Sequence, residues 1–268
     1  MLVFPRPLLA LTFVALLVCV VLAFVPSLDI AASRLFWTEG EGFWLAREPW
    51  ARVVRELSMW PTAVMAAAAL IAIVLKLVFP SSRMLLPGRL SMFFVVTVAL
   101  GPLLVVNGIL KEHWERARPV QVQAFNGPFQ FTPWWQPGSG RECTRNCSFI
   151  SGEASGAAWL TAPALLAPAP WRIAALTAVG VYTAFISTLR MGFGGHFLSD
   201  VILGALVTVW IVWLSYWWLV LSRRAIGEEA WAQRLGGWGD GIQFVVLRAG
   251  AAIVALTLGL ARFIRRPR

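Results

Sequence analysis

Six long apolar runs, separated by polar or basic stretches, follow one another along the 268 residues of the chain. A helix of about 20 apolar residues crosses the ~30 Å hydrocarbon core of a bilayer. The fourth run is shorter than the others and contains Pro163, so flanking residues must help it to cross. The pattern predicts an all-α fold, a polytopic membrane helical bundle with six core transmembrane helices. The runs cover residues 8–25, 60–79, 90–110, 154–167, 173–189 and 201–221.

Two runs near the ends of the chain leave alternatives open. Residues 242–261 form a seventh run with Arg248 inside it, which fits either a C-terminal seventh span or a helix lying in the interface. The first run is long for the apolar part of a signal peptide and no small-x-small cleavage site follows it, so an uncleaved span is favoured. No internal repeat, low-complexity tract or soluble domain is visible, and we expect residues 1–268 to form a single membrane domain.

The composition supports a membrane protein and excludes other classes. Hydrophobic residues make up 59% of the chain and charged residues 13%, about half the ~25% that soluble domains carry. This low share excludes a soluble globular domain, a disordered chain and a coiled coil, because so few charges cannot keep a protein surface soluble. The net charge of +10 fits the positive-inside bias, and attraction to anionic lipid or a phosphorylated ligand, better than it fits nucleic acid. Two histidines and three cysteines argue against a conventional zinc site.

Short basic loops set the expected topology. Because Lys and Arg concentrate in cytoplasmic loops, the long segments 26–57 and 111–152 should face outward. Cys143 and Cys147 lie in the second segment, where an oxidising periplasm would allow a disulfide if the backbone turns tightly; two free thiols are the alternative. The basic positions are Arg6, Arg83, Arg89, Arg172, Arg223 and Arg224.

Three polar clusters lie at span ends on the outward side, where ionisable residues are functional candidates. In the cluster between the fifth and sixth runs, His196 and Asp200 are four residues apart, which places them on one helical face if the sixth helix begins near His196. The carboxylate could then accept a hydrogen bond from the proton-bearing ring nitrogen and leave the other nitrogen free as a nucleophile or base. A capping Asp and an interfacial His form the alternative.

The other two clusters supply groups suited to phosphate. Lys111, Arg118 and Arg190 place three cations on the same side of the membrane. Arg offers a bidentate fork for phosphate oxygens and Lys a point charge. Ser151 and Gly152 precede an apolar helix and offer a hydroxyl and backbone N–H groups at its N-terminus, a natural phosphate cradle. Snorkelling at the interface would explain the cations alone, but not why they bracket a His–Asp pair.

Together the clusters resemble the type 2 phosphatidic acid phosphatase (PAP2) superfamily over roughly residues 90–221. Its pattern is Lys, six residues, Arg-Pro; then Pro-Ser-Gly-His; then Ser-Arg, five residues, His, three residues, Asp. Three positions depart from it: Ile150 stands for Pro, Leu189 for Ser and Glu153 for the second His. The matching residues, at the family's spacing, are Lys111, Arg118 and Pro119, then Ser151 and Gly152, then Arg190, His196 and Asp200.

The resemblance implies a mechanism that needs no metal and no other cofactor. His196 would attack phosphorus to form a phosphohistidine, Asp200 would orient it, and the three cations would stabilise the transition state. The family's second His protonates the leaving oxygen, and Glu153 would have to take that part here. Alternatively, Glu153 activates water in the second step, or only holds a cation in place. His113 could replace the missing acid, although an interfacial or supporting place is expected for it.

The function implied is that of an integral membrane phosphatase acting on a phosphorylated lipid at the periplasmic face of the bacterial inner membrane. Candidate substrates are lipid A, a polyprenyl diphosphate, phosphatidylglycerol phosphate and phosphatidic acid. The alternatives are a lipid phosphotransferase, or a non-catalytic lipid-binding member because of Glu153. The partners expected are the lipid substrate and the membrane, with no nucleic acid, and the sequence is compatible with any oligomeric state.

Overall fold

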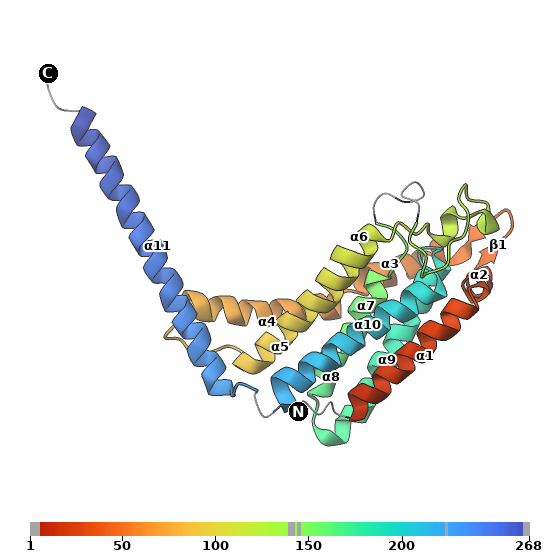
Figure 1. Ribbon diagram of the computed structural model, residues 1–268, viewed down its shortest axis with the longest axis horizontal. Coiled ribbons are helices and arrows are strands. Elements are labelled where there is room, and N and C mark those ends of the chain that lie inside the picture. Colours follow the sequence, from red (N-terminus) through yellow and green to blue (C-terminus); the bar gives the residue numbers. More distant parts are fainter. Residues whose placement is uncertain (1–5, 139–142, 144–145, 223–224, 265–268) are drawn as a thin grey trace. The chain divides into compact units, whose positions relative to one another are not determined.

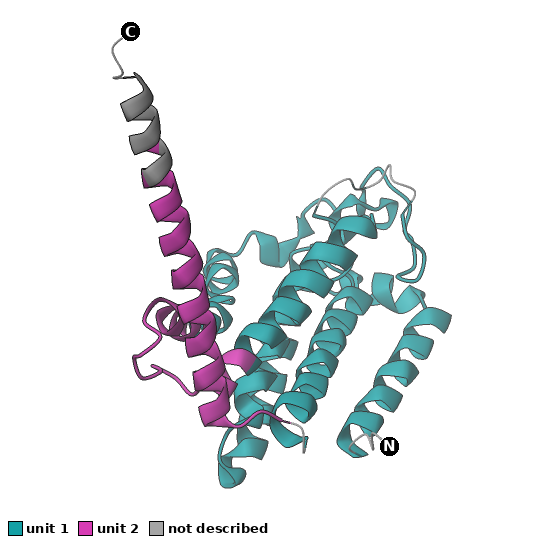
Figure 2. Ribbon diagram, turned by 60° about the vertical axis from the view of Figure 1, so that its left-hand side comes forward, with its two compact units in different colours: residues 1–66, 93–224 teal, residues 67–92, 225–268 magenta. Residues whose placement is uncertain are grey.

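The computed structural model describes residues 6–138, 143, 146–222 and 225–264. Contacts divide the chain into two compact units, where the sequence predicts one domain (Figure 2). The first unit comprises residues 1–66 and 93–224, and the second comprises residues 67–92 and 225–268. The predicted catalytic core therefore falls almost wholly in the first unit.

The first unit is a helical bundle, and the predicted all-α fold is confirmed. Its long helices run side by side, and the loops that carry the polar clusters gather at one end (Figure 1). Its elements are α1 (Arg6–Phe24), α2 (Ser27–Arg34), β1 (Trp37–Thr38), β2 (Gly42–Phe43), η1 (Trp44–Ala46), α3 (Pro49–Leu57), the start of α4 (Trp60–Val78), the end of α5 (Gly88–Val98), the π-helical η2 (Ala99–Leu110), α6 (Lys111–His113), η3 (Pro119–Gln121), η4 (Gln123–Phe125), α7 (Gly152–Trp159), α8 (Thr161–Leu165), α9 (Ala169–Gly192), α10 (Leu198–Tyr216) and the π-helical η5 (Trp217–Leu221).

Five helices in the described part of the chain are long and apolar enough to cross a membrane, as expected of a multi-pass membrane protein. The fourth predicted span differs, because residues 154–167 form the two short helices α7 and α8. Pro163 has no N–H to donate to the carbonyl of Trp159, and the helix breaks there. α7 is buried almost throughout and packs against α9, α10 and η2, so protein rather than lipid surrounds it. The five helices are Arg6–Phe24, Pro49–Val78, Gly88–His113, Ala169–Gly192 and Leu198–Leu221.

Small residues let α10 approach α7 closely. A Cβ atom at Gly204 would lie 2.8 Å from the main-chain oxygen of Ser151. The hydroxyls of Ser155 and Thr208 are 2.6 Å apart and form a hydrogen bond between the two helices. Within a membrane, such close packing and interhelical hydrogen bonds take the place of a hydrophobic driving force. The contact sets the beginning of α10 beside the beginning of α7.

Aromatic residues anchor the start of α10 to the segments that cover this end of the bundle. β1 and β2 pair antiparallel, with Trp37 opposite Phe43. Phe43 packs in one buried cluster with Phe125 and Phe197. Phe197 directly precedes α10, so the cluster joins the hairpin, the loop after α6 and this helix.

The second unit contains the long helix α11 (Glu228–Ile264). The Glu228 carboxylate accepts hydrogen bonds from the N–H groups of Gly88 and Arg89 at the start of α5, a favourable place for an anion. The predicted seventh run lies within α11, where the Arg248 guanidinium stands 4.4 Å from the ring centroid of Phe244. A seventh span and an interfacial helix both stay predictions for this segment.

Replacing Gly204 by Ala should destabilise the bundle by about 1–3 kcal/mol, because the added methyl group would press on the main chain next to α7. Gly180→Ala is the matched control. Gly180 is exposed on α9, a Cβ atom there meets nothing within 4 Å, and the change should be neutral or stabilise by up to ~1 kcal/mol. Thermal unfolding of the purified protein in detergent measures both effects. Equal unfolding temperatures for the two variants would contradict the close packing of α10 on α7.

Candidate active site

A polar cavity of about 270 Å³ lies among the N-terminus of α7, the C-terminal end of α9 and the loop before α10. It brings together six residues that the sequence predicts and four that it does not. The predicted residues come from all three motifs, so clusters that are separate in the sequence meet in one place. The six are Lys111, Arg118, Gly152, Glu153, Arg190 and His196, and the four are Arg55, Met59, Asn107 and Asn146.

His196 lies in the loop between α9 and α10, where it is buried and lines the cavity. Its Nδ1 atom is 2.6 Å from the main-chain oxygen of Ser148, so Nδ1 carries the proton and donates it to this carbonyl. The Nε2 atom then holds the free lone pair. Gly194 makes the loop possible, because its φ of +64° favours glycine and a Cβ atom there would strike the ring of Phe43.

The surroundings of His196 keep its ring neutral. Burial is the main cause that holds the pKa of His196 well below its ordinary value, and the positive charges of Arg190, Arg118 and Lys111 lower it further. The hydrogen bond to Ser148 acts in the opposite direction and has less effect. Near pH 7 the imidazole is therefore neutral, which is the form in which Nε2 can act as a nucleophile.

The structure describes both Asp200 and His196 and shows no hydrogen bond between them, contrary to the prediction. α10 begins only after His196, so the two residues do not share a helical face. The carboxylate instead accepts hydrogen bonds from the Ser148 hydroxyl at 2.5 Å, the Phe197 N–H at 2.8 Å and the Arg116 guanidinium at 2.5 Å. Ser148 thus links Asp200 to His196. Its hydroxyl donates a hydrogen bond to Asp200, and its carbonyl oxygen accepts one from the ring of His196.

Two charged residues that the sequence analysis does not single out complete this network. Arg116 is fully buried and pairs with Asp29 of α2 at 2.7 Å as well as with Asp200. Its guanidinium lies over the rings of Phe131 and Phe197, at 5.4 and 4.5 Å from their centroids. Arg116 lies between Lys111 and Arg118 in the sequence, and this place is a signal that could have found it. No spacing links Asp29 to the motifs.

Glu153 forms ion pairs with two arginines. Arg190, at the end of α9, pairs with its Oε2 atom, and the Nε atom of Arg55 lies 3.4 Å from its Oε1 atom. A carboxylate bound in this way is suited to holding cations beside the cavity, which is one of the roles that the sequence leaves open to Glu153. Arg55 belongs to α3 and is far from every motif in the sequence, so spacing could not reveal it.

Lys111 and Arg118 are the two cations of the cavity whose charges no described carboxylate neutralises. In the described part of the chain neither of them forms an ion pair. Arg118 donates a hydrogen bond to the main-chain oxygen of Asn146 at 2.7 Å. His113 is exposed, its Nδ1 atom lies 2.8 Å from the main-chain oxygen of Ile109, and it does not line the cavity. This placement does not favour His113 as a replacement acid.

Ser151 and Gly152 stand at the start of α7 and serve different purposes. The Ser151 hydroxyl accepts a hydrogen bond from the N–H of Ala154 at 3.3 Å and caps the helix, and it is not part of the cavity wall. Gly152 lines the cavity, and a Cβ atom there would lie 2.6 Å from the Oδ1 atom of Asn107. The N-terminus of α7 therefore meets the cavity through Gly152.

Cys143 and Cys147 form a disulfide in the segment before α7. The bridge encloses Asn146, whose carbonyl binds Arg118, and is followed directly by Ser148. The cross-link therefore restrains the chain next to two residues whose main-chain oxygens hold side chains of the site.

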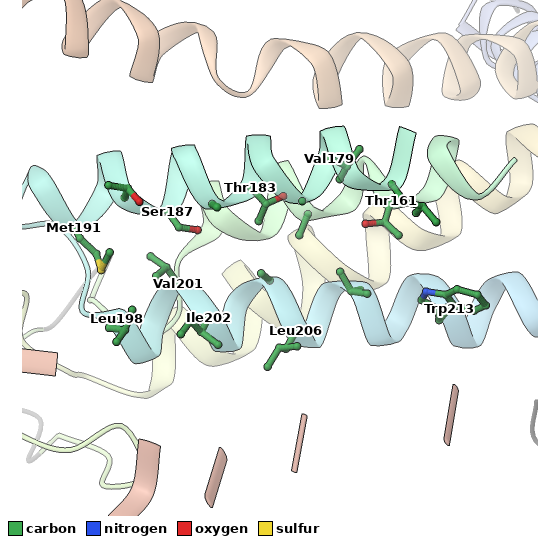
Figure 3. Close-up of a pocket in the computed structure, with 17 residues that line it drawn as sticks. Thr161, Val179, Thr183, Ser187, Met191, Leu198, Val201, Ile202, Leu206 and Trp213 are labelled. Atoms are coloured by element: carbon green, nitrogen blue, oxygen red, sulfur yellow. The ribbon is translucent and has the colours of Figure 1, made fainter. Parts of the chain in front are cut away.

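A second cavity, of about 540 Å³ and mostly apolar, lies along α9 and α10 and shares no lining residue with the polar one. Figure 3 shows Met191 and Leu198 at one end of it and Trp213 toward the other. Hydroxyl groups such as that of Thr183 interrupt its aliphatic wall. Its lining holds no Lys, Arg or His, whereas that of the polar cavity holds five. Among the described residues, no three His, Cys, Asp or Glu side chains gather as a candidate metal site.

The neutral state of His196 can be observed directly, because the chain has two histidines and His113→Gln leaves His196 alone. With ¹⁵N-labelled histidine in detergent, the NMR signals should show a protonated Nδ1, an unprotonated Nε2 and no titration between about pH 8 and about pH 6. The reason is that burial and three cations disfavour the imidazolium. A midpoint near the ordinary value of 6.5 would contradict this environment.

Arg116→Met should lower the free energy of unfolding by about 3–5 kcal/mol, because it leaves two buried carboxylates without their partner. Arg118→Met is the matched control, since Arg118 is only half-buried and forms no ion pair in the described chain. Denaturant unfolding in detergent measures both variants. Similar losses for the two would show that the buried network does not support the fold.

Three curated relatives named lipid A 4'-phosphatase are similar to about half of this chain. The relative from Rhizobium leguminosarum is 42% identical over 139 residues, which cover 52% of this chain and 55% of that protein. The relative from Rhizobium etli is 45% identical over 136 residues, which cover 50% and 49%. The relative from Francisella tularensis subsp. novicida is 40% identical over 130 residues, which cover 48% and 58%. The chain thus spans about half the length of the curated relatives it matches, and no solved structure gives a significant match.

The family model of the PAP2 superfamily matches residues 90–224, half of the chain. This segment contains the predicted residues of the polar cavity, whereas Arg55 lies before it. The resemblance carried by the three motifs is confirmed, and the chain belongs to the PAP2 superfamily.

Proposed function

We propose that this protein is an integral membrane phosphatase that removes phosphate from a phosphorylated lipid, with His196 as the nucleophile. The observation that carries the proposal is a buried, neutral histidine with a free Nε2 atom in a cavity lined by cations. Membership of the PAP2 superfamily supports phosphatase chemistry. The names of the three relatives make lipid A the first substrate to test.

The first step forms a phosphohistidine. The Nε2 lone pair of His196 attacks phosphorus, and the bond from phosphorus to the lipid oxygen breaks, so that oxygen leaves with the electron pair and takes up a proton from solvent water. Lys111, Arg118 and Arg190 bind the non-bridging oxygens, whose charge is spread in the transition state. The Ser148 carbonyl accepts the Nδ1 proton and stabilises the positive charge that develops on the ring.

The second step releases phosphate. A water molecule attacks the phosphorus of the phosphohistidine, loses a proton and displaces the Nε2 atom, which returns His196 to its neutral form. The same three cations serve this step, because the charge develops on the same oxygens. Of the roles open to Glu153, its two ion pairs favour that of holding cations in place over that of donating a proton.

The size and walls of the cavity support a phosphorylated headgroup as the part of the substrate that enters. A space of about 270 Å³ with mainly charged and amide walls suits a phosphate group and, with Met59 as its one apolar side chain besides glycine, leaves little apolar surface for an acyl chain. We therefore place the lipid tails outside the polar cavity, in the membrane. Polyprenyl diphosphate, phosphatidylglycerol phosphate and phosphatidic acid remain candidates beside lipid A.

We place the active site at the periplasmic face of the bacterial inner membrane. Arg172 lies in the first turn of α9, next to the short loop before this helix, and Arg190 lies near the other end, in the cavity. Because basic loops stay in the cytoplasm, the end that carries Arg190 faces outward.

Purified protein in detergent should release inorganic phosphate from lipid A or from another lipid of this panel, and His196→Ala should lose at least about a thousandfold in rate. His113→Gln, the other histidine of the chain, should keep the wild-type rate because it does not line the cavity. The measurement is phosphate release across the four lipids. Full activity in His196→Ala, or no release from any of the lipids by the wild type, would reject the proposed function.

A further inference from the structure

Arg55 lines the polar cavity although it lies on α3, before the segment that matches the PAP2 superfamily. Its guanidinium stands 5.6 Å from the ring centroid of Phe193, and its Nε atom is 3.4 Å from Oε1 of Glu153. These contacts hold it beside residues that follow it by more than ninety positions in the chain. α3 thereby adds a fourth cation to the site.

The carboxylate of Glu153 is shared between an inner and an outer arginine. The side chain of Arg190 is 5% exposed, whereas that of Arg55 is 44% exposed. A carboxylate paired with Arg190 alone would compete with phosphate oxygens for its N–H groups and would offset its charge. A second guanidinium on the same carboxylate draws part of that interaction away from Arg190.

We propose that Arg55 is a positioning residue, which binds Glu153 and thereby leaves Arg190 available for the phosphate group. The inference rests on the proposed function only in taking phosphate as the ligand. Arg55 acts on phosphate through Glu153 and not by touching it.

A double-mutant cycle tests the route through Glu153, with inorganic phosphate as the probe and calorimetry in detergent as the measurement. Arg55→Gln should weaken phosphate binding by about tenfold in the wild-type background and by less than about twofold in the Glu153→Gln background. Arg55→Lys, which keeps the charge, should retain most of the affinity. Arg52→Gln is the matched control, because Arg52 is exposed on the same helix, binds the main-chain oxygen of Ala46 and does not line the cavity.

The outcomes separate this inference from the proposed function. Equal losses in both backgrounds would mean that Arg55 contacts phosphate directly, and no loss in either would mean that it has no part in the site; each would overturn the inference. An unchanged unfolding temperature in Arg55→Gln shows that the loss is not one of folding, and recovery by Arg55→Lys supports the same conclusion. If the wild type binds phosphate but releases none from any lipid, the proposed function fails while the cycle still decides the role of Arg55.

Discussion

The rest of the site depends on the two ion pairs of the buried Arg116 guanidinium. It pairs with Asp29 and Asp200, and all three side chains are almost completely shielded from solvent. Charges without water are tolerated only when they are paired and fully hydrogen-bonded, because their desolvation is costly. Arg116 has both of its carboxylate partners only when α2, the loop after α6 and α10 are all in place. The position of α10 against the loops is therefore a cooperative property of the fold.

The same network fixes His196, the proposed nucleophile. Ser148 donates its main-chain N–H to the carbonyl of Arg116 at 2.9 Å and its hydroxyl to Asp200, and its own carbonyl accepts the Nδ1 proton of His196. These bonds hold Ser148 in place, so that its carbonyl fixes the ring of His196. Through Ser148, the geometry of a buried ion pair determines which nitrogen of His196 is free. The tautomer of the imidazole is consequently set by the fold rather than by the cavity.

Local patterns in the sequence predict the spans and most of the cavity, because apolar runs and motif spacings report on single elements. Contacts between distant segments leave no such pattern. Asp29 and Arg116 are 87 residues apart, and neither position shows that they meet. The predicted contact of Asp200 with His196 is wrong for a local reason, since a spacing of four pairs side chains only inside one helix and α10 begins later. The contact of Ser148 with His196 escapes prediction because it is made by the main-chain carbonyl, which residue type does not reveal.

Two helices begin at the site, and their N-termini are used differently. At α10, the carboxylates of Asp29 and Asp200 accept the main-chain N–H groups at the start of the helix. They occupy the place where the helix dipole favours negative charge, so α10 has little left to offer a phosphate. At α7, the N–H groups of Gly152 and Glu153 have no acceptor in the described part of the chain. Because Gly152 also lines the cavity, the dipole and the free donors that a phosphate group would meet there are those of α7.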